Sequence, residues 1–409
     1  MSVIENILVR GLNKINSRER EPRKDELLLG KNENGNCLWR LKAGYHLHIV
    51  GSTRSGKTRL LTAILSQLII RGISCVIIDF HSDLFRQAVS FLDNLPEDFI
   101  SDRVIIADFS RRDYLPGVNP LNLPHRAFRP SAQVNLILSS LRRRWSDSWG
   151  VRIEEIMRNS LWCLVENRLS IVDLPRLLRD ATFRAQLVSQ VSNPEVRSFF
   201  DFFENLSGPM KANWVAPITN KISAFLADPT VRQVVGQRET TIPFRRVMDN
   251  PGQVVLLNFA KAELHAETSQ LLASIMFPVI VDAIFSRVEI QPERRRPFVL
   301  IIDEAQLYST EIEGLLSESG KFGAIAISAN QHFGQLPSET RSSILANCSN
   351  MCVFRVNADD ANLLVSTIAP GLEKFIRSKL VRLGQREMLF CERNSGNTRF
   401  VKTPYVQDL

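Results

Sequence analysis

The chain has 409 residues, of which 44% are hydrophobic and 23% are charged, and its formal net charge is +8. This length allows a large buried core and two lobes, and the composition is typical of a globular protein, which excludes the disordered and fibrous classes. The positive charge suits a polyanionic partner such as nucleic acid, although solubility alone also explains an excess of this size.

The cysteines and the apolar runs indicate in which cellular compartment the protein is expected. Cys348 and Cys352 have no second pair of ligands nearby, so we expect reduced thiols and no zinc site. Residues 1–26 form a polar arm without the apolar centre of a signal peptide. The longest apolar runs, such as Leu271–Phe285, are too short and too mixed to span a bilayer. We expect a cytoplasmic protein with no transmembrane segment of its own, which a partner could recruit to a membrane.

A glycine-rich loop follows the first predicted strands. Residues 27–41 hold two short apolar runs around an Asn/Gly turn, which predicts a β-hairpin. The apolar run 45–50 leads into the loop, and apolar residues with helical spacing follow over 60–70. The loop reads Gly51, Ser52, Thr53, Arg54, Ser55, Gly56, Lys57 and Thr58. This is the full G-x-x-x-x-G-K-[ST] pattern with the strand and helix that it requires, which a chance Gly/Ser turn would lack.

The residue types of this loop suit a chain of phosphates. Its glycines let the backbone close around the phosphates, so that N–H groups at the first turn of a helix point inward. Lys57 is expected to reach the β- and γ-phosphates, and the hydroxyl of Thr58 is expected to bind Mg²⁺. We therefore predict that the chain binds ATP with Mg²⁺.

Strands and helices alternate on both sides of a long helical segment. Apolar runs without polar alternation, typical of strands buried on both faces of a parallel sheet, occur at 75–80, 103–109, 254–259, 298–302, 324–330 and 351–356. Residues 130–250 show helical spacing only. We expect an α/β fold with a mainly parallel sheet, in which a P-loop core formed by 27–129 and 251–409 is interrupted by an all-helical insertion domain over 130–250.

Two acids end the strand 298–302. Asp303 is expected to hold Mg²⁺ through water, and Glu304 is expected to polarise the attacking water as general base. A strand that happens to end in an Asp-Glu turn is the alternative. The second acid favours hydrolysis, because a nucleotide switch could bind Mg²⁺ with Asp303 alone.

Polar residues also follow two other predicted strands. Gln331 ends the strand 324–330 and is expected to sense the γ-phosphate, unless it only caps the next helix. Asp79, His81 and Asp83 lie at the edge where ligands bind in open α/β sheets, and they are candidates for supporting or structural groups.

Basic and aromatic residues occur together in the helical segment. Arg142, Arg143 and Arg144 precede Trp145 and Trp149, a mixture that suits phosphate contact and base stacking. The alternative is the end of a surface helix whose tryptophans belong to the core. A second run, Arg294–Arg296, is interpreted as a solvated loop.

The order of these motifs resembles the HerA/FtsK superfamily of DNA-pumping ATPases, and within it the conjugative coupling proteins of type IV secretion and their HerA-like relatives. The resemblance extends from about residue 27 to 405. It is carried by Gly51–Thr58, Asp79-Phe80-His81-Ser82-Asp83-Leu84, Val118-Asn119-Pro120-Leu121, Ile302-Asp303-Glu304-Ala305-Gln306 and Gly320-Lys321-Phe322-Gly323 with Asn330-Gln331.

The resemblance implies a RecA-like core, a ring-shaped homo-hexamer with ATP between subunits, and DNA in the central channel. It also implies an arginine supplied across the subunit interface, and relatives commonly carry that arginine where this chain has Gly320. Lys321 or Arg355 is then the candidate for the charge, and a lysine would stabilise less because it lacks the planar fork of arginine. Typical coupling proteins also have an N-terminal membrane segment, which this sequence does not show.

We therefore expect an ATP-hydrolysing motor that moves or delivers DNA, with single- or double-stranded DNA as its track and a relaxase or secretion channel as partner. Two alternatives stay open. One is a HerA-like translocase that acts with a nuclease in DNA processing or defence. The other is a nucleotide-gated assembly protein with little turnover, which Gly320 motivates.

Overall fold

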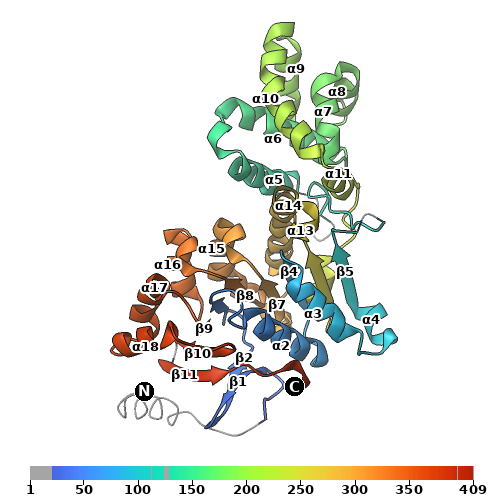
Figure 1. The fold of residues 1–409 in the computed structure, drawn as a ribbon. Helices are drawn as coiled ribbons and strands as arrows, with labels where there is room; N and C mark the ends of the chain where they lie inside the picture. The colour runs from blue at the N-terminus through green and yellow to red at the C-terminus, as the bar shows by residue number, and fades with distance from the viewer. Residues whose placement is uncertain (1–20, 112, 124–128, 394, 409) are drawn as a thin grey trace. The chain divides into compact units, whose positions relative to one another are not determined.

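The computed structural model describes residues 21–111, 113–123, 129–393 and 395–408. They divide into two compact units (Figure 1). The first unit comprises the chain up to Ile106, residues Arg246–Asn258 and the chain from Arg287 onward, and the second comprises Ala107–Arg245 and Phe259–Ser286. Each unit is described by itself.

An 11-stranded sheet forms the centre of the first unit, in the order β2-β1-β11-β10-β9-β3-β8-β7-β4-β6-β5. The strands are β1 (Glu26–Asn32), β2 (Gly35–Arg40), β3 (Leu47–Val50), β4 (Cys75–Asp79), β5 (Val104–Asp108), β6 (Val254–Asn258), β7 (Phe298–Ile302), β8 (Ala324–Asn330), β9 (Asn350–Val353), β10 (Glu387–Glu392) and β11 (Asn397–Lys402).

The sheet combines a parallel centre with an antiparallel side. β9, β3, β8, β7, β4 and β6 pair in parallel, and every residue of β3, β4, β6, β7 and β8 is buried. Such strands must be apolar because helices cover both faces. β10, β11, β1 and β2 pair antiparallel. The expected α/β fold with a mainly parallel sheet is confirmed.

The predicted hairpin is confirmed, since β1 and β2 pair antiparallel. It lies at the edge of the sheet, and β11, β10 and β9 separate it from β3.

Helices of the first unit pack on this sheet. In α2 (Lys57–Ile70) the side chains of Leu60, Leu61 and Ile64 are fully buried in the main apolar cluster, together with residues of β3, β7 and β8. The unit also holds α3 (Asp83–Leu92), α4 (Glu97–Arg103), α15 (Ser309–Glu318), α16 (Ser338–Asn347), α17 (Ala358–Ile368) and α18 (Glu373–Leu380), while α12 (Phe244–Asp249) spans the boundary between the units.

The second unit is helical. Its helices are α5 (Pro130–Arg144), α6 (Val151–Glu166), α7 (Leu174–Arg179), α8 (Ala181–Val188), α9 (Pro194–Glu204), α10 (Gly208–Leu226), α11 (Pro229–Val235), α13 (Lys261–Leu264) and α14 (Ala266–Phe285) (Figure 1). Helix α6 is central, because it contacts α5, α7, α9 and α10.

The limits of the helical unit differ from the expected insertion at both ends. The unit begins at Ala107 and also contains 259–286, a segment that the sequence pattern assigns to the core segment 251–409. The reason is packing: α14 contacts α5 and α11, and Thr268 donates a hydrogen bond to the Asp228 carboxylate at 2.7 Å.

Helix α14 also corrects our expectation about apolar runs. Residues Ala266–Glu289 form a helical stretch that is long and apolar enough to cross a membrane by length and composition. In its most apolar window 67% is buried inside the structure, which is also how the core helix of a globular protein is placed.

Two buried histidines lie at β3 in the middle of the sheet: His46 directly precedes the strand and His48 belongs to it. His46 Nδ1 accepts a hydrogen bond from the Ala326 N–H at 2.9 Å, and His48 Nδ1 lies 2.8 Å from Ser328 Oγ. Burial lowers the pKa of each imidazole to about 4. Both rings are therefore neutral inside the sheet at neutral pH.

These histidines predict a loss of stability in mild acid. Below about pH 6.5 these imidazoles become protonated in the unfolded chain, whereas in the folded chain they stay neutral down to about pH 4. The free energy of unfolding therefore falls as the pH is lowered from about 6.5 to about 4. Each imidazole contributes a slope of at most about 1.4 kcal/mol per pH unit. Chemical denaturation at several pH values should show a smaller slope for His48→Asn than for wild type; equal slopes would contradict the prediction.

Candidate active site

The predicted site residues other than Lys321 lie at one edge of the parallel sheet. Gly51 follows β3, Asp303 follows β7, Gln331 follows β8 and His81 follows β4. Val50 is paired in register with Asn330, and Ile78 with Ile302, so the residues after them emerge side by side. This is the carboxyl edge, where open α/β sheets bind their ligands.

The loop before α2 requires its glycines. A Cβ atom on Gly51 would lie 2.5 Å from Phe354 Cβ, and Gly56 has φ +121°, a conformation that L side chains rarely adopt. Two distant backbone groups hold the loop. The Ser52 N–H donates to the Arg355 carbonyl at 2.8 Å, and the Arg386 N–H donates to the Ser55 carbonyl at 2.8 Å.

Donors in this loop fit a phosphate chain. Ser52 Oγ and Ser55 Oγ are buried atoms without a hydrogen-bond partner, as expected of groups that a phosphate oxygen would satisfy. Lys57 Nζ lies 3.3 Å from the Ser52 carbonyl. Burial lowers the pKa of Lys57, while the carboxylates of Asp303 and Glu304 act in the opposite direction.

Mg²⁺ also fits these residues. The described part of the chain has no group of three His, Cys, Asp or Glu side chains able to hold a metal. Mg²⁺ at a nucleotide needs no such group, because one carboxylate and one hydroxyl suffice besides phosphate and water, and Asp303 and Thr58 could supply them. Burial, together with the nearby Asp79 and Glu304 carboxylates, raises the pKa of Asp303 to about 7. A bound cation would favour its ionised form.

Side-chain donors surround Glu304. Gln331 Nε2 donates to Glu304 Oε1 at 3.0 Å, Gln306 Nε2 donates to Oε2, and His81 Nε2 lies 3.3 Å from Oε1. Burial alone would raise the pKa of this carboxyl, but hydrogen bonds from His81, Gln306 and Gln331 outweigh it and lower the pKa to about 2. Glu304 is therefore ionised, buried and held from several sides.

Gln331 connects this acid to the phosphate loop. Its Oε1 accepts a hydrogen bond from Thr53 Oγ1 at 3.1 Å, while its Nε2 donates to Glu304. One amide thus touches both the loop that would hold the phosphates and the candidate base. The expectation that Gln331 only caps a helix does not account for either contact.

The two candidates for an interface charge lie at opposite edges of the sheet. Arg355 follows β9 and its carbonyl binds the phosphate loop of its own subunit. Lys321 is exposed and lies in the turn before β8, at the amino edge. β8 has 7 residues, which corresponds to about 20 Å, so Lys321 cannot reach the phosphate loop of its own chain.

Gly320 is packed too tightly to carry a side chain. A Cβ atom there would lie 2.6 Å from the Cα atom of Gly44, far below ordinary contact. Gly44 is itself anchored, since its N–H donates to the Ala324 carbonyl at 3.2 Å. The arginine that the resemblance implies would therefore clash with Gly44 at this position.

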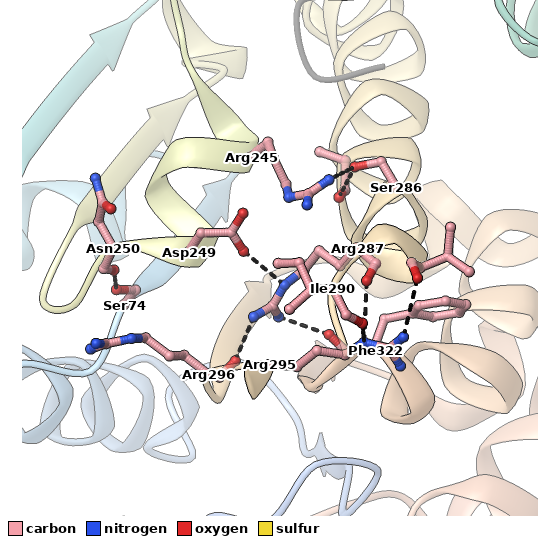
Figure 2. A network of polar contacts seen from close by, with 12 residues as sticks. Ser74, Arg245, Asp249, Asn250, Ser286, Arg287, Ile290, Arg295, Arg296 and Phe322 are labelled. Carbon is pink, nitrogen blue, oxygen red and sulfur yellow. Dashed lines mark hydrogen bonds and ion pairs between the residues drawn. The ribbon is translucent and has the colours of Figure 1, made fainter. Parts of the chain in front are cut away.

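Two arginines fix the turn that contains Lys321 (Figure 2). The fully buried Arg287 donates to the Phe322 and Arg296 carbonyls, both at 2.8 Å, and lies 3.1 Å from Asp249. Arg295 donates to the carbonyl of Lys321 and to that of Ile290. The interpretation of Arg294–Arg296 as a solvated loop is therefore wrong for Arg295, although Arg294 and Arg296 are exposed.

Some residues of the site were missed from the sequence. Gln306 lies two residues after Glu304, and nothing in this spacing predicts its hydrogen bond to the Glu304 carboxylate. Arg386 is more than 300 residues from the phosphate loop along the chain, yet its N–H binds the Ser55 carbonyl of that loop. Its guanidinium lies 3.5 Å from the ring centre of Tyr405. No local pattern predicts such contacts.

Comparison with known proteins agrees with this geometry. A family model described as the central domain of the helicase HerA matches residues 42–159. No curated protein sequence matches the chain. Among solved structures, the unbound bacterial conjugative coupling protein TrwB has a TM-score of 0.64 at 15% identity, covering 97% of this chain and 91% of that chain.

Two further structures are similar. TrwB in complex with ADP and Mg²⁺ has a TM-score of 0.64 at 15% identity, covering 97% of this chain and 92% of that chain. VirB4 of Thermoanaerobacter pseudethanolicus has a TM-score of 0.64 at 13% identity, covering 95% and 98%. At such identities the likeness shows a shared fold. Residues 42–159 are thus similar to the central domain of the helicase HerA, and the chain has the fold of TrwB and VirB4.

Proposed function

We propose that this ATPase uses hydrolysis to move or deliver DNA, and that it works as a ring with ATP between subunits. The observation that carries the hydrolytic part is the chain of contacts from Thr53 through Gln331 to Glu304. It places a buried, ionised acid at the carboxyl edge of the sheet and links it to the phosphate loop.

The residues have distinct tasks in this reaction. Lys57 binds the β- and γ-phosphates, and Glu304 orients the attacking water and accepts its proton. Gln331 donates a hydrogen bond to the γ-phosphate and couples its presence to Glu304. Thr58 and Asp303 would hold Mg²⁺, which neutralises charge on the phosphates when it is bound.

The DNA part rests on the similarity to a coupling protein over almost the whole chain and on a candidate surface in the helical unit. Trp145 and Trp149 are half-buried and stacked, with ring centres 6.3 Å apart. Arg144, Trp145 and Lys221 line a cavity of about 520 Å³. Exposed cations beside aromatic rings favour single-stranded nucleic acid, because bases stack on the rings while phosphates meet the cations.

Steady-state ATP hydrolysis with and without DNA tests the proposal. Single-stranded DNA should stimulate turnover, and a double-stranded DNA of equal length should do so less. Strand displacement or movement past a bound roadblock would then show translocation. Turnover that ignores every DNA tested, in a preparation that binds ATP, would contradict the DNA part of the proposal.

We predict that Trp145→Ala weakens binding of single-stranded DNA by about 1–3 kcal/mol, the usual value of one stacked base. Trp214→Ala is the matched control, because Trp214 is also half-buried in the helical unit but contacts Phe202 and Arg152 instead. Fluorescence anisotropy with a labelled oligonucleotide measures both. Equal losses in the two variants would indicate a general effect on folding.

One observation favours a second candidate, a nucleotide-gated assembly protein with little turnover. Gly320 leaves no space for the arginine that relatives carry, and a missing interface charge slows phosphoryl transfer. Such a protein would form rings with ATP yet lose no function when Glu304 is changed to Gln. For either candidate function, the partners to seek by copurification are a relaxase, a secretion channel or a nuclease.

A further inference from the structure

We propose that His81 is a positioning residue for hydrolysis, and that it holds the Glu304 carboxylate in the orientation needed to activate water. The inference rests on the proposed role of Glu304. Its carrying observation is the 3.3 Å contact between His81 Nε2 and Glu304 Oε1, which joins the end of β4 to the end of the neighbouring strand β7.

The backbone of His81 is fixed by its own strand. Asp79 accepts hydrogen bonds from the His81 N–H at 2.9 Å and from the Phe85 N–H at 2.7 Å. Next to it, Ser82 has φ +68° and its hydroxyl donates to Asn258 Oδ1 at 2.9 Å. Because Asp79, Ser82 and Asn258 are all buried, the loop offers a rigid support from which the imidazole reaches Glu304.

Glu304 needs such support because its backbone is strained. Its φ of +59° is in the left-handed region, which is unfavourable for a non-glycine residue and persists only where surrounding contacts enforce it. Gln306 belongs to the same turn and Gln331 belongs to the phosphate-sensing strand end. His81 is thus the partner that ties the Glu304 carboxylate to β4, on the side of the sheet away from β8.

A purely structural role of His81 would predict a loss of stability on its removal and not a specific loss of kcat. The side chain of His81 is 37% exposed, so its removal leaves no cavity in the core and costs little packing. Its loss should instead let the Glu304 carboxylate rotate away from the water that it activates. Misplacement of a catalytic group lowers kcat, whereas contacts of the phosphate loop that set the affinity for ATP are unchanged.

Steady-state kinetics of a small variant series tests this inference. For His81→Ala we expect kcat for ATP to fall about tenfold, with KM within about twofold of wild type. His81→Gln keeps an Nε2 donor and should recover kcat to within about threefold of wild type. Asn94→Ala is the matched control and should keep the wild-type kcat, since it removes an exposed polar side chain after α3 that bonds to the Ser90 carbonyl and does not contact Glu304. Thermal melting and binding of a fluorescent ATP analogue verify that each variant is folded.

The outcomes separate the inference from the function on which it rests. Glu304→Gln is measured in parallel, and the double variant His81→Ala/Glu304→Gln should be no slower than Glu304→Gln alone, because both act on one group. If Glu304→Gln keeps wild-type turnover, the proposed hydrolytic role fails. If Glu304→Gln is inactive and His81→Ala keeps its kcat, or if Ala and Gln at position 81 are equally slow, only the role of His81 is overturned.

Discussion

Replacing Glu304 with glutamine should lower kcat for ATP hydrolysis by about 10²- to 10⁴-fold, the usual contribution of a general base. Glutamine keeps the size of the side chain and can still meet Gln306 and Gln331, but it cannot accept the proton of the attacking water. ATP binding should stay within a fewfold of wild type, because Lys57 and the loop glycines are unchanged. Phosphate release and binding of a fluorescent ATP analogue measure the two quantities.

The matched control for this change is Glu339→Gln, which makes the same substitution at an exposed position in the first turn of α16. It should leave turnover at the wild-type level. A Glu304→Gln variant with wild-type turnover would remove the basis for a hydrolytic motor and would favour the nucleotide-gated assembly protein.

Lys321→Ala is expected to reduce turnover by about 10²- to 10³-fold if Lys321 supplies its charge to a neighbouring subunit. An arginine in this role is worth 10³-fold or more, and a lysine stabilises less. The physical reason for action between subunits is distance, since Lys321 lies at the amino edge of β8 and the phosphate loop lies at the carboxyl edge. Lys374→Ala, at an exposed position on α18, is the control for loss of a surface charge.

Mixing variants distinguishes action between subunits from action within one. A Lys321→Ala subunit keeps its Glu304, and a Glu304→Gln subunit keeps its Lys321. In a ring assembled from equal amounts of both, about a quarter of the interfaces combine the two intact residues (one half times one half). Turnover of the mixture should therefore exceed that of either variant alone. A mixture no more active than the variants measured separately would contradict an interface role for Lys321.

Local patterns predicted the α/β fold because strands buried on both faces must be continuously apolar. The run Phe298–Ile302, which Asp303 and Glu304 follow, forms strand β7 between β8 and β4, inside the sheet as expected. The limits of the helical unit could not be predicted in this way. Helix α14 is apolar around most of its surface. Such a helix can pack against a sheet or against other helices equally well, so its sequence does not show to which unit it belongs.

The sequence by itself identified the phosphate loop, the Asp-Glu pair and Gln331 as candidates for the chemistry, because residue type and a place directly after a strand are local features. Only the tertiary structure decided where other residues act. Strand β3 pairs with β8 and β9, whose partner residues lie 280 and 303 positions further along the chain, and no local spacing encodes that order. The pairing of β3 with β8 brings Gly44 against Gly320 and places Lys321 at the edge opposite its own phosphate loop. The pairing of β7 with β8 puts Gln331 beside Glu304.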